Sequence, residues 1–210
     1  MELSNKSLAF LLVVAIVISV GGTMISLTRL NSLQYTGFTL SNSPQGTANL
    51  TINSSLVLTF VVSNVDFGTG YTNDTGAGME YCIIDTNGTN PIGDCVGFNS
   101  NVGPFELQND GNRNLTVTLS ANKNASDFIT GTSPVFQFFV ENNATAPGCA
   151  SPQPSSWTNA NTSTPTICPS KGFDYTDGSD VMDIHVKVSI PQDATPGSKT
   201  AIFTASGSDV

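Results

Sequence analysis

The N-terminal part of the chain contains an uncharged run of 22 residues, from Ser7 to Thr28, whose centre, Leu8–Ile18, is wholly apolar. A helix needs roughly 20 apolar residues to cross a bilayer, and a secretory signal needs an apolar stretch of about 7–15 residues followed by small residues. The run satisfies both descriptions. Residues 1–36 are therefore predicted to be a signal peptide or a transmembrane anchor with a short juxtamembrane segment, and residues 37–210 an extracellular domain.

Two details favour a retained anchor at residues 8–27 over a cleaved signal. Residues 21–23 (GGT) make a poor cleavage site, and the apolar pattern continues after them. One positive charge flanks the run on each side, Lys6 before it and Arg29 after it, so the charges do not indicate how the helix is oriented across the membrane. A buried core helix is disfavoured, because such helices seldom stay apolar on every face.

The chain beyond residue 36 is acidic but carries few charges. It has 15 acidic and 5 basic side chains, and charged residues make up only 11% of the whole chain. Nucleic-acid binding needs clustered Lys and Arg, so this balance argues against a nucleic-acid partner and against adhesion to an anionic lipid surface. Asn, Ser and Thr together number 69, which predicts a polar, largely uncharged surface.

Four cysteines follow the apolar run, at Cys82, Cys95, Cys149 and Cys168. An even number at these spacings in an exported chain predicts two disulfides. Several pairings are open, and Cys82–Cys95 with Cys149–Cys168 is favoured because each closes a short loop. A four-cysteine zinc site is disfavoured, because zinc ligands usually come as closely spaced pairs.

The acceptor pattern for N-linked glycosylation, Asn-x-Ser/Thr, occurs eight times beyond the apolar run. This exceeds what the Asn, Ser and Thr content gives by chance, so a glycosylated surface is predicted. None of the eight lies beyond residue 161, which indicates that the C-terminal strands face protein. The predicted sites are Asn49, Asn53, Asn73, Asn87, Asn114, Asn124, Asn143 and Asn161.

Short apolar segments alternate with turn signals beyond residue 36, as is typical of β-strands. Ile184–Ile190 alternates most regularly and predicts a strand with one buried face. Leu56–Val62 is apolar on both faces and predicts a central strand. Leu50 and Ile52 predict a further strand before it. The fold class predicted is all-β: an antiparallel Ig-like or jelly-roll β-sandwich of about 8–9 strands after one hydrophobic helix.

Residues 142–180 interrupt this succession of strand-like segments and turns. The segment is rich in Pro, Ser, Thr and Gly, and it contains Cys149, Cys168 and the only tryptophan, Trp157. We predict a long disulfide-closed loop, and such loops are often functional. Trp157 is expected to pack on the Cys149–Cys168 bridge or on the sandwich edge.

The sequence lacks the residue combinations of known enzyme sites. His185 is the only histidine, lies on the polar face of a predicted strand, and has no Ser or Cys nucleophile near it in the sequence. Glycoside hydrolysis needs a pair of carboxylates, but Glu80, Glu106 and Glu141 lie far apart in the sequence and their spacing identifies no such pair. We therefore expect no catalytic residues, no cofactor and no enzymatic activity.

One acidic cluster stands out in the stretch DYTDGSDVMD, which ends at Asp183. Oxygen ligands grouped around a glycine turn can hold calcium, which makes Asp174, Asp177 and Asp180 a candidate site. The order of an EF-hand loop is missing, so a solvated loop is favoured and no metal is expected.

Three regions of the chain are distinctive: LAFLLVVAIVISVGGTMISLTRLNSL with TGFT and TANLTIN after it, FELQNDGNRNLTVTL, and VMDIHVKVSIPQDATPGSKTAIFTAS. These stretches resemble archaeal exported surface proteins. The same plan is similar to that of the TasA and camelysin-like filament subunits. The resemblance implies a β-sandwich that polymerises by donating a strand, here from Thr36–Ile52, to its neighbour. The chain departs from the pattern in lacking a clear cleavage site that would release this segment.

These features lead to one main expectation and one alternative. The main expectation is a non-enzymatic structural surface glycoprotein, either anchored singly and adhesive or assembled into a pilus-like filament by donor-strand pairing. Its partners are expected to be further copies of the chain or other surface proteins, and the membrane if residues 8–27 are retained. The alternative is an anchored module that binds carbohydrate or solute through the 142–180 loop.

Overall fold

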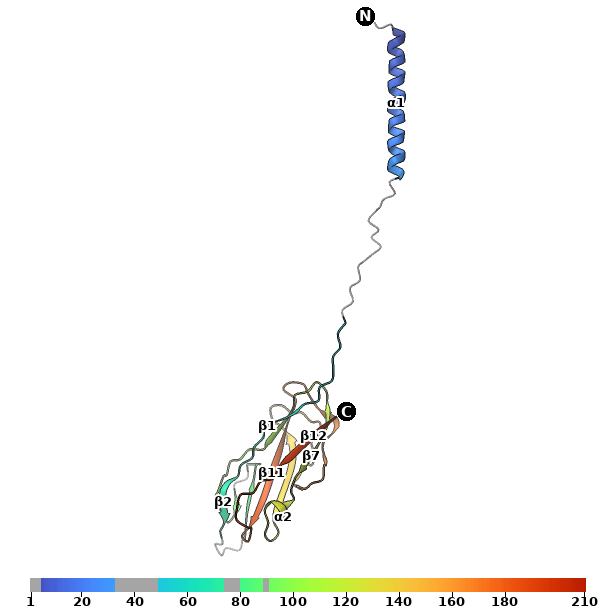
Figure 1. The fold of residues 1–210 in the computed structure, drawn as a ribbon. Helices are drawn as coiled ribbons and strands as arrows, with labels where there is room; N and C mark the ends of the chain where they lie inside the picture. The colour runs from blue at the N-terminus through green and yellow to red at the C-terminus, as the bar shows by residue number, and fades with distance from the viewer. Residues whose placement is uncertain (1–4, 33–48, 74–79, 89–90) are drawn as a thin grey trace. The chain divides into compact units, whose positions relative to one another are not determined.

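The computed structural model describes residues 5–32, 49–73, 80–88 and 91–210. The chain divides into two compact units, Met1–Thr51 and Ile52–Val210. The first unit contains one helix, α1 (Asn5–Ser32), and the second contains the β-structure (Figure 1). The predicted boundary between residues 36 and 37 lies outside the described residues.

Helix α1 is long and apolar enough to cross a membrane along Asn5–Ile25. In a bilayer the backbone must satisfy its own hydrogen bonds, and a helix does so within one segment. Gly21 and Gly22 do not interrupt it. Thr23 donates its hydroxyl to the carbonyl oxygen of Ser19 at 2.7 Å, so this polar group also has its partner inside the helix. The predicted apolar helix is confirmed, and signal and anchor stay alternatives because both have this character.

The largest sheet of the second unit has seven strands, and the long strand β11 (Val181–Pro191) is at its centre. Strand β8 (Val135–Asn142) pairs along one side of β11, whereas β6 (Phe105–Asn109) and β3 (Tyr81–Asp85) share the other side. All of these pairs are antiparallel. The outer members are β1 (Leu58–Val62) beyond β6, β4 (Ile92–Gly93) beyond β3, and β9 (Thr158–Asn159) beyond β8.

A second sheet has three strands in the order β10 (Thr166–Phe173), β7 (Leu115–Ala121) and β12 (Phe203–Asp209). Its inward side chains share one hydrophobic core with those of the large sheet. The Phe203 ring, for example, lies 5.6 Å from that of Phe105 and 5.5 Å from that of Phe136. The two sheets therefore form an all-β sandwich, as predicted.

Smaller elements complete the second unit. Strands β2 (Gly68–Thr72) and β5 (Cys95–Phe98) form a two-stranded sheet, and the short helix α2 (Ala125–Phe128) is capped by the Asn124 side chain. The described residues thus contain twelve strands, more than the predicted number. The excess comes from very short strands such as β4 and β9, with two residues each.

Strand β11 confirms the predicted alternation on its inner face, where Met182, Ile184, Val186 and Val188 are buried. Its opposite face differs from the prediction, because His185 and Ser189 are buried as well. His185 is buried because Phe139 from β8 stacks on its ring, and Trp157 packs edge-on against Phe139. Trp157 therefore covers the outer face of the large sheet rather than the Cys149–Cys168 bridge.

The predictions for residues 50–62 need two corrections. Strand β1 lies at the edge of the large sheet, with β6 as its neighbour, and not at its centre. Its second apolar face is open, which leaves Val61 54% exposed. Leu50 and Ile52 lie outside the strands and are largely exposed. An apolar pattern on both faces predicts burial only where a second layer covers the strand.

The segment at residues 142–180 is closed by the Cys149–Cys168 disulfide, as predicted, but it is not one long loop, because it contains β9 and β10. Ile167, Cys168 and Phe173 are fully buried, and β10 forms one edge of the second sheet. The strand was hidden in the sequence because its pairing with β7 is irregular between Cys168 and Phe173, and Gly172 there has a φ of +78°. Such bulges break the alternation by which strands are predicted.

Candidate functional site

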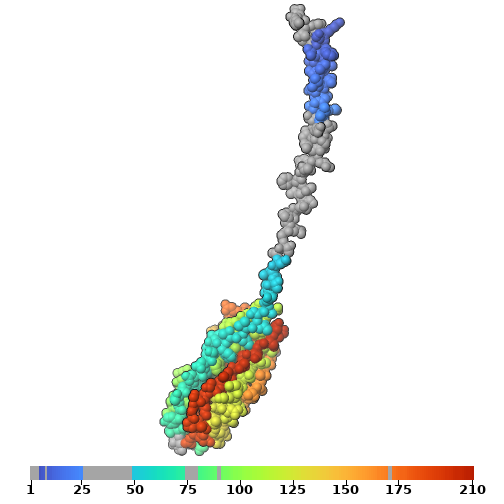
Figure 2. Space-filling view, viewed as in Figure 1, coloured from blue at the N-terminus to red at the C-terminus, as the bar shows by residue number. Residues whose placement is uncertain are grey.

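The sandwich has an open edge formed by β12 of the second sheet and β1 of the large sheet. Within the described residues β12 pairs with β7 alone, and β1 with β6 alone. The two strands lie close together, because a Cβ atom added to Gly207 would be 3.1 Å from Leu58 Cδ1. Figure 2 shows β12 as a red band on the molecular surface, beside the cyan-to-green segment that includes β1. We call β1 and β12 together the open edge.

The open edge has the properties of a surface that accepts another strand. Alternate residues of an edge strand direct their N–H and C=O groups away from the sheet. Two exposed apolar side chains belong to or adjoin these strands: Val61 of β1 is 54% exposed, and Ile202, the residue before β12, is 56% exposed. The central side chains of β12 are small, so a further backbone can approach closely: Thr204, Ala205, Ser206, Gly207 and Ser208.

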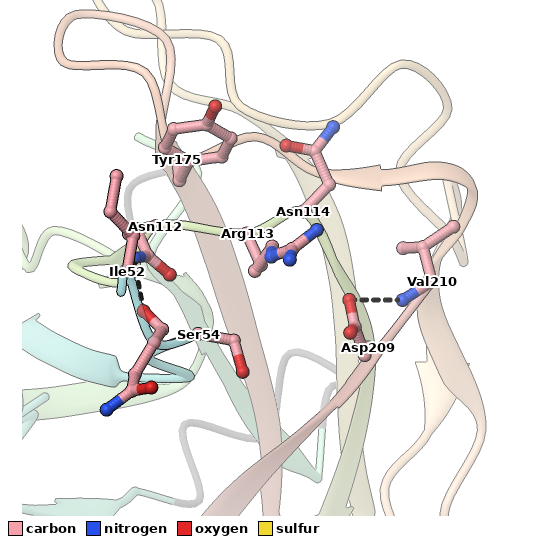
Figure 3. Close-up of a pocket in the computed structure, with 9 residues that line it drawn as sticks. Ile52, Ser54, Asn112, Arg113, Asn114, Tyr175, Asp209 and Val210 are labelled. Atoms are coloured by element: carbon pink, nitrogen blue, oxygen red, sulfur yellow. Dashed lines mark hydrogen bonds between the residues drawn. The ribbon is translucent and has the colours of Figure 1, made fainter. Parts of the chain in front are cut away.

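A shallow pocket of about 600 Å³ lies at one end of the open edge (Figure 3). Figure 3 shows Arg113 in the middle of the lining residues, with Tyr175 and Asn114 on one side and Ser54 and Asp209 on the other. The pocket is mainly polar and combines a cation, a carboxylate, amides and one aromatic ring. It can therefore hold a polar solute or sugar, and Tyr175 connects it with the segment that was predicted to bind such ligands.

Two asparagines, Asn109 and Asn112, hold the turn between β6 and β7, and this turn contributes Asn112 and Arg113 to the lining of the pocket. Asn109 is 1% exposed. Its Nδ2 donates to the carbonyl oxygens of Arg113 and Phe173, both at 2.9 Å, and its Oδ1 accepts from the Gly111 N–H at 3.1 Å. The buried amide thus fixes the turn against β10, and all of its hydrogen-bonding groups have partners.

Asn112 holds the chain that leads into β1. The Ser55 N–H donates to Asn112 Oδ1 at 2.7 Å, and Asn112 Nδ2 donates to the carbonyl oxygen of Asn53 at 2.9 Å. A Cβ atom on Gly111 would lie 2.4 Å from the Ser55 carbonyl oxygen, so only glycine allows this approach. These contacts hold residues 53–55, which precede β1 of the open edge, in a fixed position.

The structure contains both disulfides in the favoured pairing, Cys82–Cys95 and Cys149–Cys168, with Cα atoms 4.8 and 5.9 Å apart. The first joins β3 of the large sheet to β5 of the two-stranded sheet. The second joins β10 to the segment that follows β8. An N-terminal apolar helix combined with two disulfides is typical of a secreted or membrane-anchored extracellular protein.

The predicted glycosylation sites differ in how accessible their side chains are. Asn114 and Asn143 are half-buried, and the Nδ2 of Asn143, which a glycan would modify, donates to Asp183 Oδ1 at 3.0 Å. Asn161 Oδ1 accepts from the N–H two residues on at 2.8 Å, which leaves its Nδ2 pointing elsewhere. Six of the eight asparagines are exposed: Asn49, Asn53, Asn73, Asn87, Asn124 and Asn161.

His185 is the centre of a contact that the sequence did not predict. Its Nε2 lies 3.0 Å from Glu141 Oε1, its Nδ1 lies 3.3 Å from Thr86 Oγ1, and its ring stacks on Phe139 with the planes 6° apart. Thr86 is buried and its Oγ1 also accepts from the Val186 N–H, so its hydroxyl is not exposed to act as a nucleophile. Only the register of β3, β8 and β11 brings these distant residues together.

Lys187 contacts the aromatic group formed by His185, Phe139 and Trp157, at its Trp157 end. Its Nζ lies 4.6 Å from the centre of the Trp157 ring, and its strand register places it opposite Asp85. Burial lowers the pKa of the Lys187 amine, and the Asp85 charge partly offsets this effect. A cation over a tryptophan face adds attraction to the packing, which keeps Trp157 on the sheet.

The acidic cluster Asp174, Asp177 and Asp180 gains no support as a calcium site. Asp180 is buried and its carboxylate accepts from Gln108 Nε2 at 2.8 Å, whereas Asp174 accepts from a backbone N–H of its own loop. In the described part of the chain a different group of metal-ligating side chains converges. It consists of Glu141, Asp183 and His185.

Comparison with known proteins returns no matching family model, no matching curated protein and no matching solved structure. The function of the chain must therefore be inferred from its own geometry and chemistry.

Proposed function

We propose that this protein is a non-enzymatic structural glycoprotein of the cell surface that assembles with copies of itself through the open edge. The observation that supports the proposal is the edge itself. An exposed edge strand pairs readily with other chains unless charge, proline or a covering element prevents it. Strand β12 has no proline, and its single charged side chain is Asp209 at its end.

The proposed occupant of the open edge is the segment before β1 of a neighbouring copy. The described part of this segment begins at residue 49, and Leu50 and Ile52 in it alternate with polar residues. An alternating segment that pairs with β12 turns one apolar side toward the sandwich. Burying one such side chain contributes about 1.5–3 kcal/mol, and each added backbone hydrogen bond about 0.5–1.5 kcal/mol.

The remaining features agree with a role outside the cell. The apolar helix delivers the sandwich across the membrane, the two disulfides lock it in an oxidising environment, and the glycans on exposed asparagines keep a weakly charged surface soluble. The resemblance of five sequence stretches to archaeal exported surface proteins points the same way.

Replacing Ile202 with lysine tests the proposal. Ile202 is 56% exposed beside β12, so its completed burial in an assembly contributes about half of the full value for an isoleucine, roughly 1–1.5 kcal/mol. Its loss, with the added cost of burying an ammonium, should weaken assembly at least about tenfold. The matched control is Ile92→Lys on β4, because Ile92 is 44% exposed and lies on a different strand at the sheet's periphery.

Sedimentation and electron microscopy of the purified full chain give the readout. The expected result is regular assemblies of the wild type and of Ile92→Lys, and mainly dispersed protein for Ile202→Lys. Equal assembly of the two variants contradicts the proposal. A wild-type protein that stays dispersed but binds oligosaccharides would support the second candidate, a carbohydrate- or solute-binding module, which the pocket of Figure 3 favours.

A further inference from the structure

The outer face of the large sheet carries a row of three carboxylates in register. Asp183 on β11 is paired with Glu141 on β8 and, on its other side, with Glu106 on β6. Like charges directly opposite each other destabilise a sheet. Lys187 cannot balance the row, because its register places it opposite Asp85 and Gln137. The row is therefore a place where a bound cation would stabilise the fold.

The imidazole of His185 adds a nitrogen ligand at one end of this row. One ligand atom each from Glu141, Asp183 and His185 lies within 4.8 Å of the other two. One nitrogen and two carboxylate oxygens form a donor set that zinc accepts, with bonds of about 2.0–2.2 Å. The Glu141 side chain is 52% exposed, so it is free to make the small approach that such bonds require.

Neighbouring groups already orient two of the three ligands. A metal-bound histidine normally donates its other ring N–H to a fixed acceptor, and Thr86 Oγ1 lies 3.3 Å from His185 Nδ1. Thr86 is itself fixed, because its Oγ1 accepts from the Val186 N–H at 2.9 Å. Asn143 Nδ2 donates to Asp183 Oδ1, which leaves the rest of that carboxylate for a metal.

We propose that Glu141, Asp183 and His185 form a zinc site on the outer face of the sheet, with water completing the coordination. The proposal is independent of the surface role described above. Zinc takes the Nε2 lone pair of a neutral His185 whose proton resides on Nδ1, toward Thr86. It replaces the hydrogen bond between His185 and Glu141, and any proton held at Nε2 is released to solvent. The bound ion ties β8 to β11.

Calorimetric titration of zinc chloride into the chelator-treated full chain in detergent tests the site. Wild-type protein should bind one zinc ion per chain. Glu141→Gln should bind it at least about tenfold more weakly, because one ligand is lost. The matched control is Glu106→Gln, which removes the same charge from the same row but lies outside the converging group, and its affinity should stay within about twofold of wild type. Thermal unfolding without zinc checks that both variants are folded.

Nuclear magnetic resonance of the ring nitrogens provides the second readout. His185 is the only histidine in the chain, so its ring signals identify themselves. Zinc should move the Nε2 signal, and calcium at the same concentration should not, because calcium takes oxygen ligands. The proposal is overturned if zinc gives neither heat nor a shift of this signal. It is equally overturned if both glutamate variants weaken binding alike, since that shows attraction by charge alone.

Discussion

Replacing Asn109 with alanine tests how much of the fold's stability depends on one buried amide. Asn109 is 1% exposed and makes three side-chain hydrogen bonds, to Arg113, Phe173 and Gly111. Each bond contributes about 0.5–1.5 kcal/mol, and buried partners left without a bond add to the cost. The expected loss of unfolding free energy is therefore about 2–4 kcal/mol. For a protein of this length the midpoint of thermal unfolding should fall by roughly 10 °C.

Asn112→Ala is the matched control for this prediction. The Asn112 side chain also makes two hydrogen bonds to the backbone, but it is exposed, so water replaces its bonds. Its expected cost is below about 1 kcal/mol. Urea unfolding followed by the fluorescence of Trp157, the only tryptophan, measures both variants. Equal losses for the two, or a loss below about 1 kcal/mol for Asn109→Ala, would refute burial as the source of the difference.

Two further predictions concern the second disulfide and one surface carboxylate. The Cys149–Cys168 bridge spans a sequence separation of 19, and the double alanine variant should lose about 3 kcal/mol in urea unfolding; an unchanged midpoint would contradict this. Hydrogen bonds from Thr132 lower the pKa of Asp193 below its usual value in the folded protein. The contribution of Asp193 to the free energy of unfolding is therefore fully present above its pKa in the unfolded chain, and it is lost as the pH falls through its pKa in the folded protein. The stability difference between wild type and Asp193→Asn should therefore shrink in acid. Thermal unfolding of both proteins across a range of pH measures this difference, and a constant difference would contradict the prediction.

Local patterns in the sequence predicted several features of the fold. The alternation at Ile184–Ile190 identified the inner face of β11, because that strand is regular and packs on one continuous core. The short spacings of the cysteines identified both disulfides, because loop closure favours near neighbours in the chain. The length of the apolar run identified α1. In each case the information lies within about 20–30 consecutive residues.

Features that depend on strand register were not predictable in the same way. The contact between His185, Glu141 and Thr86 needs three strands in one particular alignment, and a shift of one residue would turn each side chain to the other face. The edge position of β1 depends on which strands pair with it, and apolarity on both faces does not reveal that. Strand β10 was missed because its irregular pairing, with Gly172 at positive φ, breaks the alternation.

The central claim is that the open edge receives a strand from a second copy of the chain. Electron cryomicroscopy of the native assembly, isolated from the cell surface, tests it most directly. We expect density for an added strand, hydrogen-bonded to β12 on the side away from β7 and belonging to a neighbouring copy. A native particle in which that side of β12 faces solvent, or is covered by a segment of its own chain, would contradict the account.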